Sequence, residues 1–131
     1  WDSIESTDIF YVDALFLTVS MDSARIVAEH CTKMEKVLCL HLSARYLCAS
    51  FADRIVQLIP YTDYVFGNES EYMELARAHK EDVGSGFEAA ASFIAKIPRA
   101  DGSPKKKRHV IATNGTKPCV VASLWRGYGV K

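Results

Sequence analysis

The sequence predicts a three-layer αβα fold, in which a mostly parallel sheet is covered by helices on both faces. Patterns of buried strands alternate with helical patterns in the order βαβαβ, which is typical of parallel sheets. The chain has 131 residues, close to the commonest size of a single domain and enough to bury one core. A short turn separates the last two strand patterns, so we also expect a C-terminal hairpin.

The first strand and helix are predicted from the run "DIFYVDALFLTVS" and the segment that follows it. Residues 8–20 are rich in Phe, Tyr, Val and Leu, which suits one strand buried on both faces. Residues 21–36 place apolar side chains at helical spacing, and Ser20 or Asp22 is a suitable N-cap. The apolar positions of this helix are Ala24, Val27, Ala28, Cys31 and Met34.

Five further elements follow before the first long polar loop. "VLCLHL" at 37–42 predicts a second buried strand, and "CASFADRIVQLIP" predicts a helix that ends near Pro60. "DYVFGN" at 63–68 predicts a third strand. Two more helices are expected, from Glu69 to about Lys80 and from Gly86 to about Ile97, separated by the break "EDVGSG".

The last third of the chain begins with the polar loop "PRADGSPKKKR". Its charge run has the composition of a nuclear import signal or basic patch, but it precedes a strand pattern, so we interpret it as a solvated loop. "HVIAT" at 109–113 and "CVVAS" at 119–123 predict two strands joined by the turn "NGTKP".

Composition excludes several classes of protein. Sixteen Lys and Arg balance sixteen Asp and Glu, and hydrophobic residues make up 49%, which argues against disorder and against a nucleic-acid-binding surface. No run approaches the roughly 18 apolar residues of a membrane helix. The start "WDSIESTDIF" is acidic and lacks Met, so we expect a chain taken from something longer, with no membrane partner.

The cysteines and histidines indicate structural roles. No Cys-x-x-Cys pair and no zinc-finger spacing occurs, so we expect reduced, mostly buried thiols in a cytoplasmic protein. The histidines are far apart in sequence and form no metal motif, so each is interpreted as structural. These residues are Cys31, Cys39, Cys48 and Cys119, and His30, His41, His79 and His109.

The third strand runs directly into an acidic helix start, with Asn68, Glu69 and Glu71 at the junction. Ligands of parallel α/β sheets gather at such carboxyl ends of strands. One interpretation is that the two glutamates only complement the helix dipole. The other is that Asn68 and Glu71, three residues apart, hold a hydrated cation beside phosphate oxygens.

The turn "ATNGTKP" allows two interpretations as well. It is an ordinary hairpin turn with Asn-Gly at its centre, or a phosphate loop that offers the Thr113 hydroxyl and backbone N–H groups around Gly115. Neither Gly-x-x-x-x-Gly-Lys-Ser/Thr nor Gly-x-Gly-x-x-Gly occurs, so the two common nucleotide fingerprints do not apply.

Four segments together resemble the middle of ribokinase-like carbohydrate and nucleoside kinases over about residues 5–123. They are "ALFLTVSMDSARIVAEHC", "LHLSARY", "IPYTDYVFGNESEYMELA" and "HVIATNGTKP", in the family's order and at similar separation. "PYTDYVFGNESE" is the most specific. "FLTVS" resembles the members that phosphorylate adenosine more than those acting on ribose or fructose.

The resemblance implies roles for five residues. Asn68 and Glu71 would organise Mg²⁺ and the phosphates of ATP, with Glu71 acting on the metal through water. Thr113 and Gly115 match the loop that contacts ATP as co-substrate. Phe16 matches the aromatic residue that stacks on the adenine of adenosine.

Two departures from the family limit what this chain can do. His41 and Arg45 replace an Asn and a Pro that flank "LSA" in most members, which puts a nucleotide contact there in doubt. The family's Asp-Thr-x-Gly-Ala-Gly-Asp motif, which supplies the catalytic base, is absent, and the tail 124–131 leaves the family pattern. We therefore expect residues 1–131 to be an incomplete kinase domain, lacking the N-terminal lid part and the C-terminal catalytic motif and inactive alone.

The first functional hypothesis is phosphorylation of adenosine to AMP with ATP and Mg²⁺, a purine-salvage reaction, by a complete, monomeric cytoplasmic protein that binds no nucleic acid. The second is a non-catalytic remnant that acts as an α/β interaction or binding module. Another sugar kinase of the same family is the third.

Overall fold

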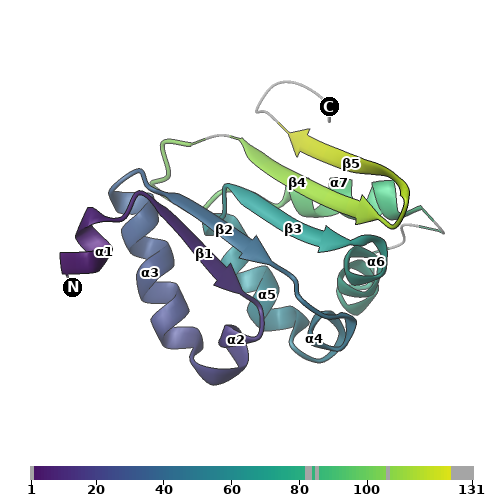
Figure 1. The fold of residues 1–131 in the computed structure, drawn as a ribbon, viewed down its shortest axis with the longest axis horizontal. Helices are drawn as coiled ribbons and strands as arrows, with labels where there is room; N and C mark the ends of the chain where they lie inside the picture. Colours follow the sequence, from purple (N-terminus) through teal and green to yellow (C-terminus); the bar gives the residue numbers. More distant parts are fainter. Residues whose placement is uncertain (1, 82–83, 85, 106, 125–131) are drawn as a thin grey trace.

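A five-stranded sheet organises the computed structural model, which describes residues 2–81, 84, 86–105 and 107–124. The strand order is β1-β2-β3-β4-β5; the first four strands are parallel, and β5 is antiparallel to β4 (Figure 1). The α/β class, the mostly parallel sheet and the terminal hairpin are confirmed. The strands are β1 Ile9–Asp13, β2 Val37–His41, β3 Tyr64–Asn68, β4 Arg108–Asn114 and β5 Lys117–Leu124.

The helices that pack on the sheet all cover the same face (Figure 1). The predicted second helical layer is not found in the part of the chain that the structure describes. Right-handed crossovers between parallel strands that are added in one direction place every connecting helix on one side. The helices are α1 Asp2–Ser6, α2 Phe16–Val19, α3 Met21–Lys33, α4 Arg45–Ser50, α5 Ala52–Leu58, the 3₁₀ turn η1 Ile59–Tyr61, α6 Glu69–Ala78 and α7 Phe87–Lys96.

The other face of the sheet, which we name the open face, leaves apolar side chains in contact with solvent. Ile9 is 64%, Tyr11 61% and Val121 51% exposed. Parallel sheets are usually covered on both faces. The alternation of strand and helix patterns in the sequence does not determine the order of the strands in the sheet. That order therefore decides whether the helices of this chain cover one face of the sheet or both.

The first apolar run does not form one strand. β1 ends at Asp13, whose Oδ1 accepts a hydrogen bond from the backbone N–H of Leu15 at 2.8 Å. This side chain-to-backbone bond turns the chain into α2, which begins at Phe16 and buries Leu17 completely. The predicted strand 8–20 is therefore a short strand, a turn and a short helix, and β1 is half-buried on one face and exposed on the other.

The core lies between the covered face of the sheet and the helices. Strand residues Leu38, Leu40, Val65 and Val110 are fully buried there. They meet apolar helix residues that are also fully buried: Leu17, Ile55, Leu58, Leu75 and Ile94.

Two contacts fix α6 against the sheet. The Tyr72 hydroxyl donates to the backbone oxygens of Val65 at 2.8 Å and Ile111 at 3.0 Å, and burial raises the pKa of this phenol. Gly67 permits the close approach, because a Cβ there would lie 2.9 Å from Leu42 Cδ1 and 3.0 Å from Glu71 Oε2. The start of α6 is therefore held tightly at the carboxyl end of β3.

The cysteines follow the sequence interpretation. All four are free thiols, and only Cys119 is exposed. None of the helices in the described ranges is long and apolar enough to cross a membrane.

The interpretation of the charge run as a solvated loop fails at both of its ends. Lys105 is half-buried, with its Nζ 3.1 Å from Asp63 Oδ2. Arg108 is 1% exposed, because it begins β4 on the covered face of the sheet and its guanidinium donates to the backbone oxygens of Ile94 and Ile97 at the end of α7. Lys107 is exposed, as expected, and residue 106 and the tail from 125 onward lie outside the described residues.

Candidate functional site

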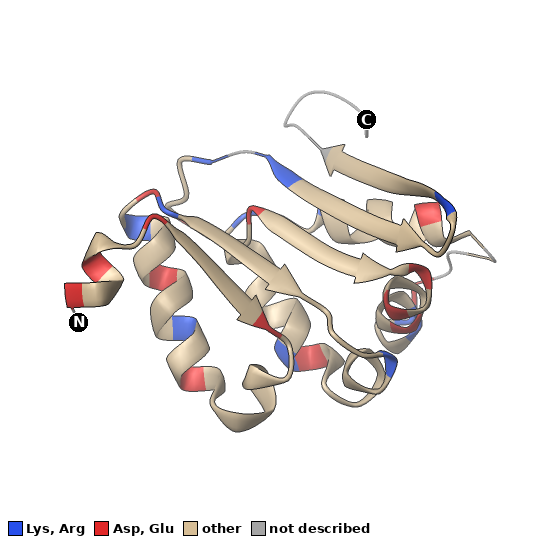
Figure 2. Cartoon of the chain, viewed as in Figure 1, with Lys and Arg blue, Asp and Glu red and all other residues tan. Residues whose placement is uncertain are grey.

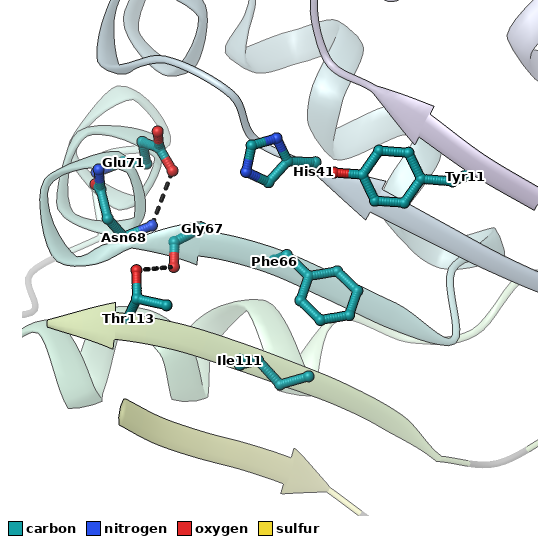
Figure 3. Close-up of a pocket in the computed structure, with 8 residues that line it drawn as sticks. All are labelled: Tyr11, His41, Phe66, Gly67, Asn68, Glu71, Ile111 and Thr113. Carbon is teal, nitrogen blue, oxygen red and sulfur yellow. Dashed lines mark hydrogen bonds between the residues drawn. The ribbon is translucent and has the colours of Figure 1, made fainter. Parts of the chain in front are cut away.

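A pocket of about 370 Å³ lies on the open face, at the carboxyl ends of the parallel strands (Figure 3). This is the edge where α/β sheets bind ligands. β1 to β4 and the start of α6 all contribute to it. The lining residues are Tyr11, His41, Phe66, Gly67, Asn68, Glu71, Ile111 and Thr113.

Asn68 and Glu71 are joined by two reciprocal hydrogen bonds at the start of α6. Asn68 Oδ1 accepts from the Glu71 N–H at 2.9 Å, and Glu71 Oε2 accepts from the Asn68 N–H at 2.8 Å. Together they form a capping box, which satisfies two N–H groups that a helix start leaves free. The interpretation of the acidic residues as part of a helix start is thus confirmed for Glu71, through a hydrogen bond as well as through the dipole.

The capping box uses only part of each side chain. Within the described residues, Glu71 Oε1 and Asn68 Nδ2 take part in no hydrogen bond, and both side chains line the pocket. A carboxylate oxygen suits a water molecule of a hydrated cation, and an amide N–H suits a phosphate oxygen. The same geometry therefore serves helix capping and leaves one polar atom of each side chain without a hydrogen bond within the described residues.

A direct metal centre does not form here. The described residues contain no group of three or more His, Cys, Asp or Glu side chains placed to hold a metal ion. Mg²⁺ commonly keeps several waters and takes one or two carboxylates together with phosphate oxygens. Glu71 therefore fits the predicted contact through water and does not fit an all-protein cage.

Thr113 reaches the pocket and Gly115 does not line it. Thr113 pairs with Asn68 in the sheet register, and its hydroxyl donates to the Gly67 oxygen at 3.4 Å. Asn114 pairs with Lys117, so Gly115 and Thr116 form the centre of the hairpin, one residue later than predicted. Gly115 has φ +58°, a left-handed conformation that glycine adopts without strain.

Phe16 lies outside the pocket lining as well. It begins α2 and is 41% exposed, so it lies outside β1, although one strand was predicted over residues 8–20. The core position in this segment belongs to its neighbour Leu17. The structure thus brings Asn68, Glu71 and Thr113 together in the pocket. It places Phe16 in α2, after β1, and Gly115 in the turn after β4, both outside the lining.

Five lining residues were not singled out as ligand contacts from the sequence: Tyr11, Gly67, His41, Phe66 and Ile111. The last three face one another in register across β2, β3 and β4, and Asp13 of β1 pairs with His41. The alternation of side chains along each strand predicts that these residues lie on the same face of the sheet. The register that aligns them is known only once the strands are paired. His41, interpreted as structural, is therefore a pocket residue.

His41 is held by neighbours from two segments. Its Nδ1 lies 3.7 Å from Asp13 Oδ2 and 3.3 Å from the Ser43 hydroxyl, and its ring stacks on Tyr11 at 6.2 Å between centroids. Partial burial opposes charge on Asp13, but hydrogen bonds with Ser43 and Leu15 and the proximity of His41 lower its pKa overall. The pocket thus has an oriented imidazole on the side opposite Glu71 (Figure 3).

The fold is that of an α/β domain with a pocket at the carboxyl edge of its sheet. The chain belongs to the pfkB family of carbohydrate kinases, whose family model matches residues 1–131. The ribokinase-like resemblance is therefore confirmed.

The relatives of this chain include adenosine kinases of plants and fungi. Adenosine kinase 2 of Arabidopsis thaliana is 38% identical over 125 residues, and adenosine kinase of Schizosaccharomyces pombe is 32% identical over 124 residues. Each match covers 93% of this chain and 34% and 35% of the respective relative. The chain therefore spans about a third of the length of the relatives it matches.

Solved structures agree with the sequence comparison. Adenosine kinase from Schistosoma mansoni, in complex with adenosine in an occluded loop conformation, superposes with a TM-score of 0.89 and 29% identity, covering 100% of this chain and 37% of that one. Anopheles gambiae adenosine kinase, in complex with a di(adenosine) tetraphosphate, gives a TM-score of 0.85 and 28% identity over 99% of this chain and 38% of that one.

Proposed function

We propose that the gene product that contains this chain transfers the γ-phosphate of ATP to the 5′-hydroxyl of adenosine, with Mg²⁺, to form AMP. The similarity to adenosine kinases over nearly the whole chain supports this substrate. The position of the pocket at the carboxyl edge of the sheet supports a phosphate ligand.

The observation that carries the proposal is the fixed orientation of Asn68 and Glu71. The capping box holds both side chains in one geometry. Within the described residues Glu71 Oε1 and Asn68 Nδ2 take part in no hydrogen bond, and both residues line the pocket. When bound, Mg²⁺ would neutralise charge on the phosphate oxygens. Glu71 would order the water shell of the ion, and the Asn68 amide would donate to a phosphate oxygen, so both act by positioning.

The remaining predicted contacts surround this centre. Thr113 would donate its hydroxyl to ATP, and the backbone around Gly115 would approach the nucleotide closely. Phe16, exposed at the start of α2, would stack on the adenine of adenosine. No residue of this chain is assigned as the general base, because the Asp-Thr-x-Gly-Ala-Gly-Asp motif is absent from the 131 residues.

The test is product formation by the full gene product. With ATP, Mg²⁺ and adenosine we expect AMP, and with ribose or fructose in place of adenosine we expect little turnover. Efficient phosphorylation of a sugar and not of adenosine would instead make the protein a sugar kinase of the same family. No transfer to any of the three acceptors, with a folded protein and magnesium present, would contradict the kinase proposal.

The open face favours a second candidate, a non-catalytic α/β binding module. Ile9 and Tyr11 on β1 and Val121 on β5 expose apolar side chains on this face, and exposed apolar surface is typical of interaction sites. An inactive full gene product that still binds adenosine in equilibrium dialysis would favour this candidate. We further propose a cytoplasmic monomer that binds no nucleic acid, supported by the free thiols and the balanced charge.

A further inference from the structure

A second pocket, of about 480 Å³, lies at the opposite edge of the sheet, where β4 begins. It is formed by the end of α7, the loop 97–105 and Arg108. Arg108 and Thr113 are five residues apart on β4, which places the two pockets about 17 Å from each other. In Figure 2 the loop that leads to β4 and the first residues of β4 are marked as basic. A ligand here would not touch the candidate functional site.

Arg108 is a buried cation without a bonded carboxylate. Its Nε donates to the Thr62 hydroxyl at 3.1 Å and backbone oxygen at 3.3 Å, and its Nη1 donates to Ile94 and Ile97 oxygens at 3.1 and 2.6 Å. All these acceptors are neutral. Among the described residues its Nη2 has no partner, although the side chain is 1% exposed and lines the pocket.

The one buried carboxylate nearby is already shared by two other cations. Asp63 Oδ1 accepts from Arg99 Nη2 at 3.1 Å, and Asp63 Oδ2 accepts from Lys105 Nζ at 3.1 Å and from the Leu38 N–H at 2.8 Å. Arg99 also has a buried Nε that bonds to nothing in the described part of the chain. Both guanidiniums therefore present an N–H group without an acceptor.

The charges of this cluster do not balance. Arg99, Lys105 and Arg108 face one buried carboxylate, and the carbonyl end of α7 supplies only a partial negative charge. Lys96 and Asp101, both exposed on the rim, add one charge of each sign. Burial, and then the charge of Arg99, lower the pKa of Arg108 to about 9. A buried cation in this position is costly until an anion approaches it.

We propose that this pocket binds a small oxyanion, of which phosphate is the model, through Arg99, Lys105 and Arg108. An oxyanion has several acceptor oxygens, and guanidinium N–H groups match them in geometry. The shared chemistry is the phosphoryl group, free or carried by a small phosphate monoester. The site depends neither on adenosine nor on ATP, so it stands apart from the proposed function.

The experiment measures phosphate binding to the full gene product by calorimetry and by ³¹P NMR, at constant ionic strength maintained with chloride. We expect saturable binding of one phosphate, and weaker binding by about tenfold in Arg99→Gln and Lys105→Gln. Lys107→Gln is the matched control, because this exposed lysine belongs to the same charge run and does not line the pocket. Glycerol 3-phosphate, titrated in parallel, separates the two sources: tighter binding than phosphate indicates a monoester, and equal or weaker binding indicates the free ion.

Three results would overturn the proposal. The first is no saturable binding by the folded wild-type protein. The second is an equal loss in Lys107→Gln and Arg99→Gln, since this would mean non-specific attraction. The third is a loss in Asn68→Asp with none in Arg99→Gln, which would place the anion in the candidate functional site. Circular dichroism of each variant checks its fold, and Lys105→Gln, the change at the least buried of the three cations, tests the site if Arg99→Gln proves unstable.

Discussion

The side chains of Asn68 and Glu71 each accept a hydrogen bond from the backbone N–H of the other residue, at 2.9 and 2.8 Å. Both residues line the same pocket. One pair of residues thus starts α6 and presents an amide and a carboxylate oxygen at the carboxyl edge of the sheet. The stability role and the proposed ligand role use different atoms of these side chains. They can therefore be separated by substitution.

Glu71→Gln should lower turnover of the full gene product with little change in stability. Gln preserves the capping box, because its side-chain oxygen accepts the same bond from Asn68, but it removes the charge that orders the hydrated cation. We expect at least about a tenfold loss of kcat, a shifted magnesium dependence and a modest change in adenosine KM. Steady-state kinetics over a magnesium series check this. Unchanged kcat and magnesium response would leave Glu71 as a helix-start residue only.

Asn68→Ala should destabilise the fold, whereas Asn68→Asp should not. Ala removes the side-chain oxygen that accepts the Glu71 N–H bond, and loss of such a cap lowers the free energy of unfolding by about 1 kcal/mol. Asp keeps an acceptor there and adds a charge that the helix dipole favours. Urea denaturation of both variants measures the difference. Equal stabilities would mean that the cap contributes little to folding.

Most helices and strands could be predicted from the sequence, because apolar spacing and helix caps depend on residues that are close together in the chain. "DYVFGN" became β3, the helix from Glu69 begins where expected, and Ser20 caps α3 by accepting the Ser23 N–H bond. The run 8–20 failed because its apolar composition suits a buried strand and a buried helix alike. Only the bond between Asp13 and Leu15 shows where the strand stops.

Three of the eight pocket residues were predicted, and several of the others depend on register. Asn68 and Thr113 end predicted strands and Glu71 lies in the helix start that follows, so each could be assigned separately. His41 and Ile111 join them only because β2, β3 and β4 are aligned side by side. The burial of Arg108 was missed for a similar reason, since its acceptors lie on α7, more than ten residues away in sequence.

The four cysteines should react very differently with a thiol reagent at pH 8. Cys119 is exposed, whereas burial raises the pKa of Cys48 to about 12, of Cys31 to about 11, and of Cys39 above its ordinary value. Because the thiolate is the reactive form, we expect Cys119 alone among these four to react fast in the native protein, and all four to react fast after denaturation. Cys119→Ser should remove the fast labelling at this position, measured by peptide mapping. Fast labelling of Cys31, Cys39 or Cys48 in the native wild type would contradict their buried positions.

The raised pKa values of the buried thiols predict that the free energy of unfolding falls at alkaline pH. Above about pH 9 an unfolded chain loses its thiol protons while the buried thiols keep theirs, so the folded state binds more protons. The free energy of unfolding should be insensitive to these groups below pH 9 and should decrease toward pH 11 to 12. Urea denaturation at several pH values, with Cys48→Ala as the comparison, measures the contribution. If Cys48→Ala leaves the pH dependence of the free energy of unfolding unchanged, the predicted contribution of Cys48 is contradicted.

Residues 1–131 expressed alone should not phosphorylate adenosine. Proton removal by a base and stabilisation of the transferred phosphoryl group each contribute orders of magnitude in rate, and the chain lacks the Asp-Thr-x-Gly-Ala-Gly-Asp motif that the family resemblance associates with both. Incubation of host-free protein with ATP, Mg²⁺ and adenosine, followed by chromatography of AMP, tests this. AMP formation that depends on both substrates would show that a base lies within these residues.

Phe16→Ala in the full gene product should raise the KM for adenosine and change stability little. Phe16 is 41% exposed at the start of α2, so its removal should cost far less than the roughly 3 to 5 kcal/mol of a buried phenylalanine. If the ring stacks on adenine, its loss should weaken adenosine binding by about 1 to 3 kcal/mol, shared by ground and transition states, and barely affect ATP. Leu17→Ala is the matched control, because this fully buried neighbour should lose about 2 to 5 kcal/mol of stability with a normal KM in the folded fraction. Thermal denaturation and adenosine kinetics on both variants separate the roles, and an unchanged KM in a stable Phe16→Ala protein would end the stacking assignment.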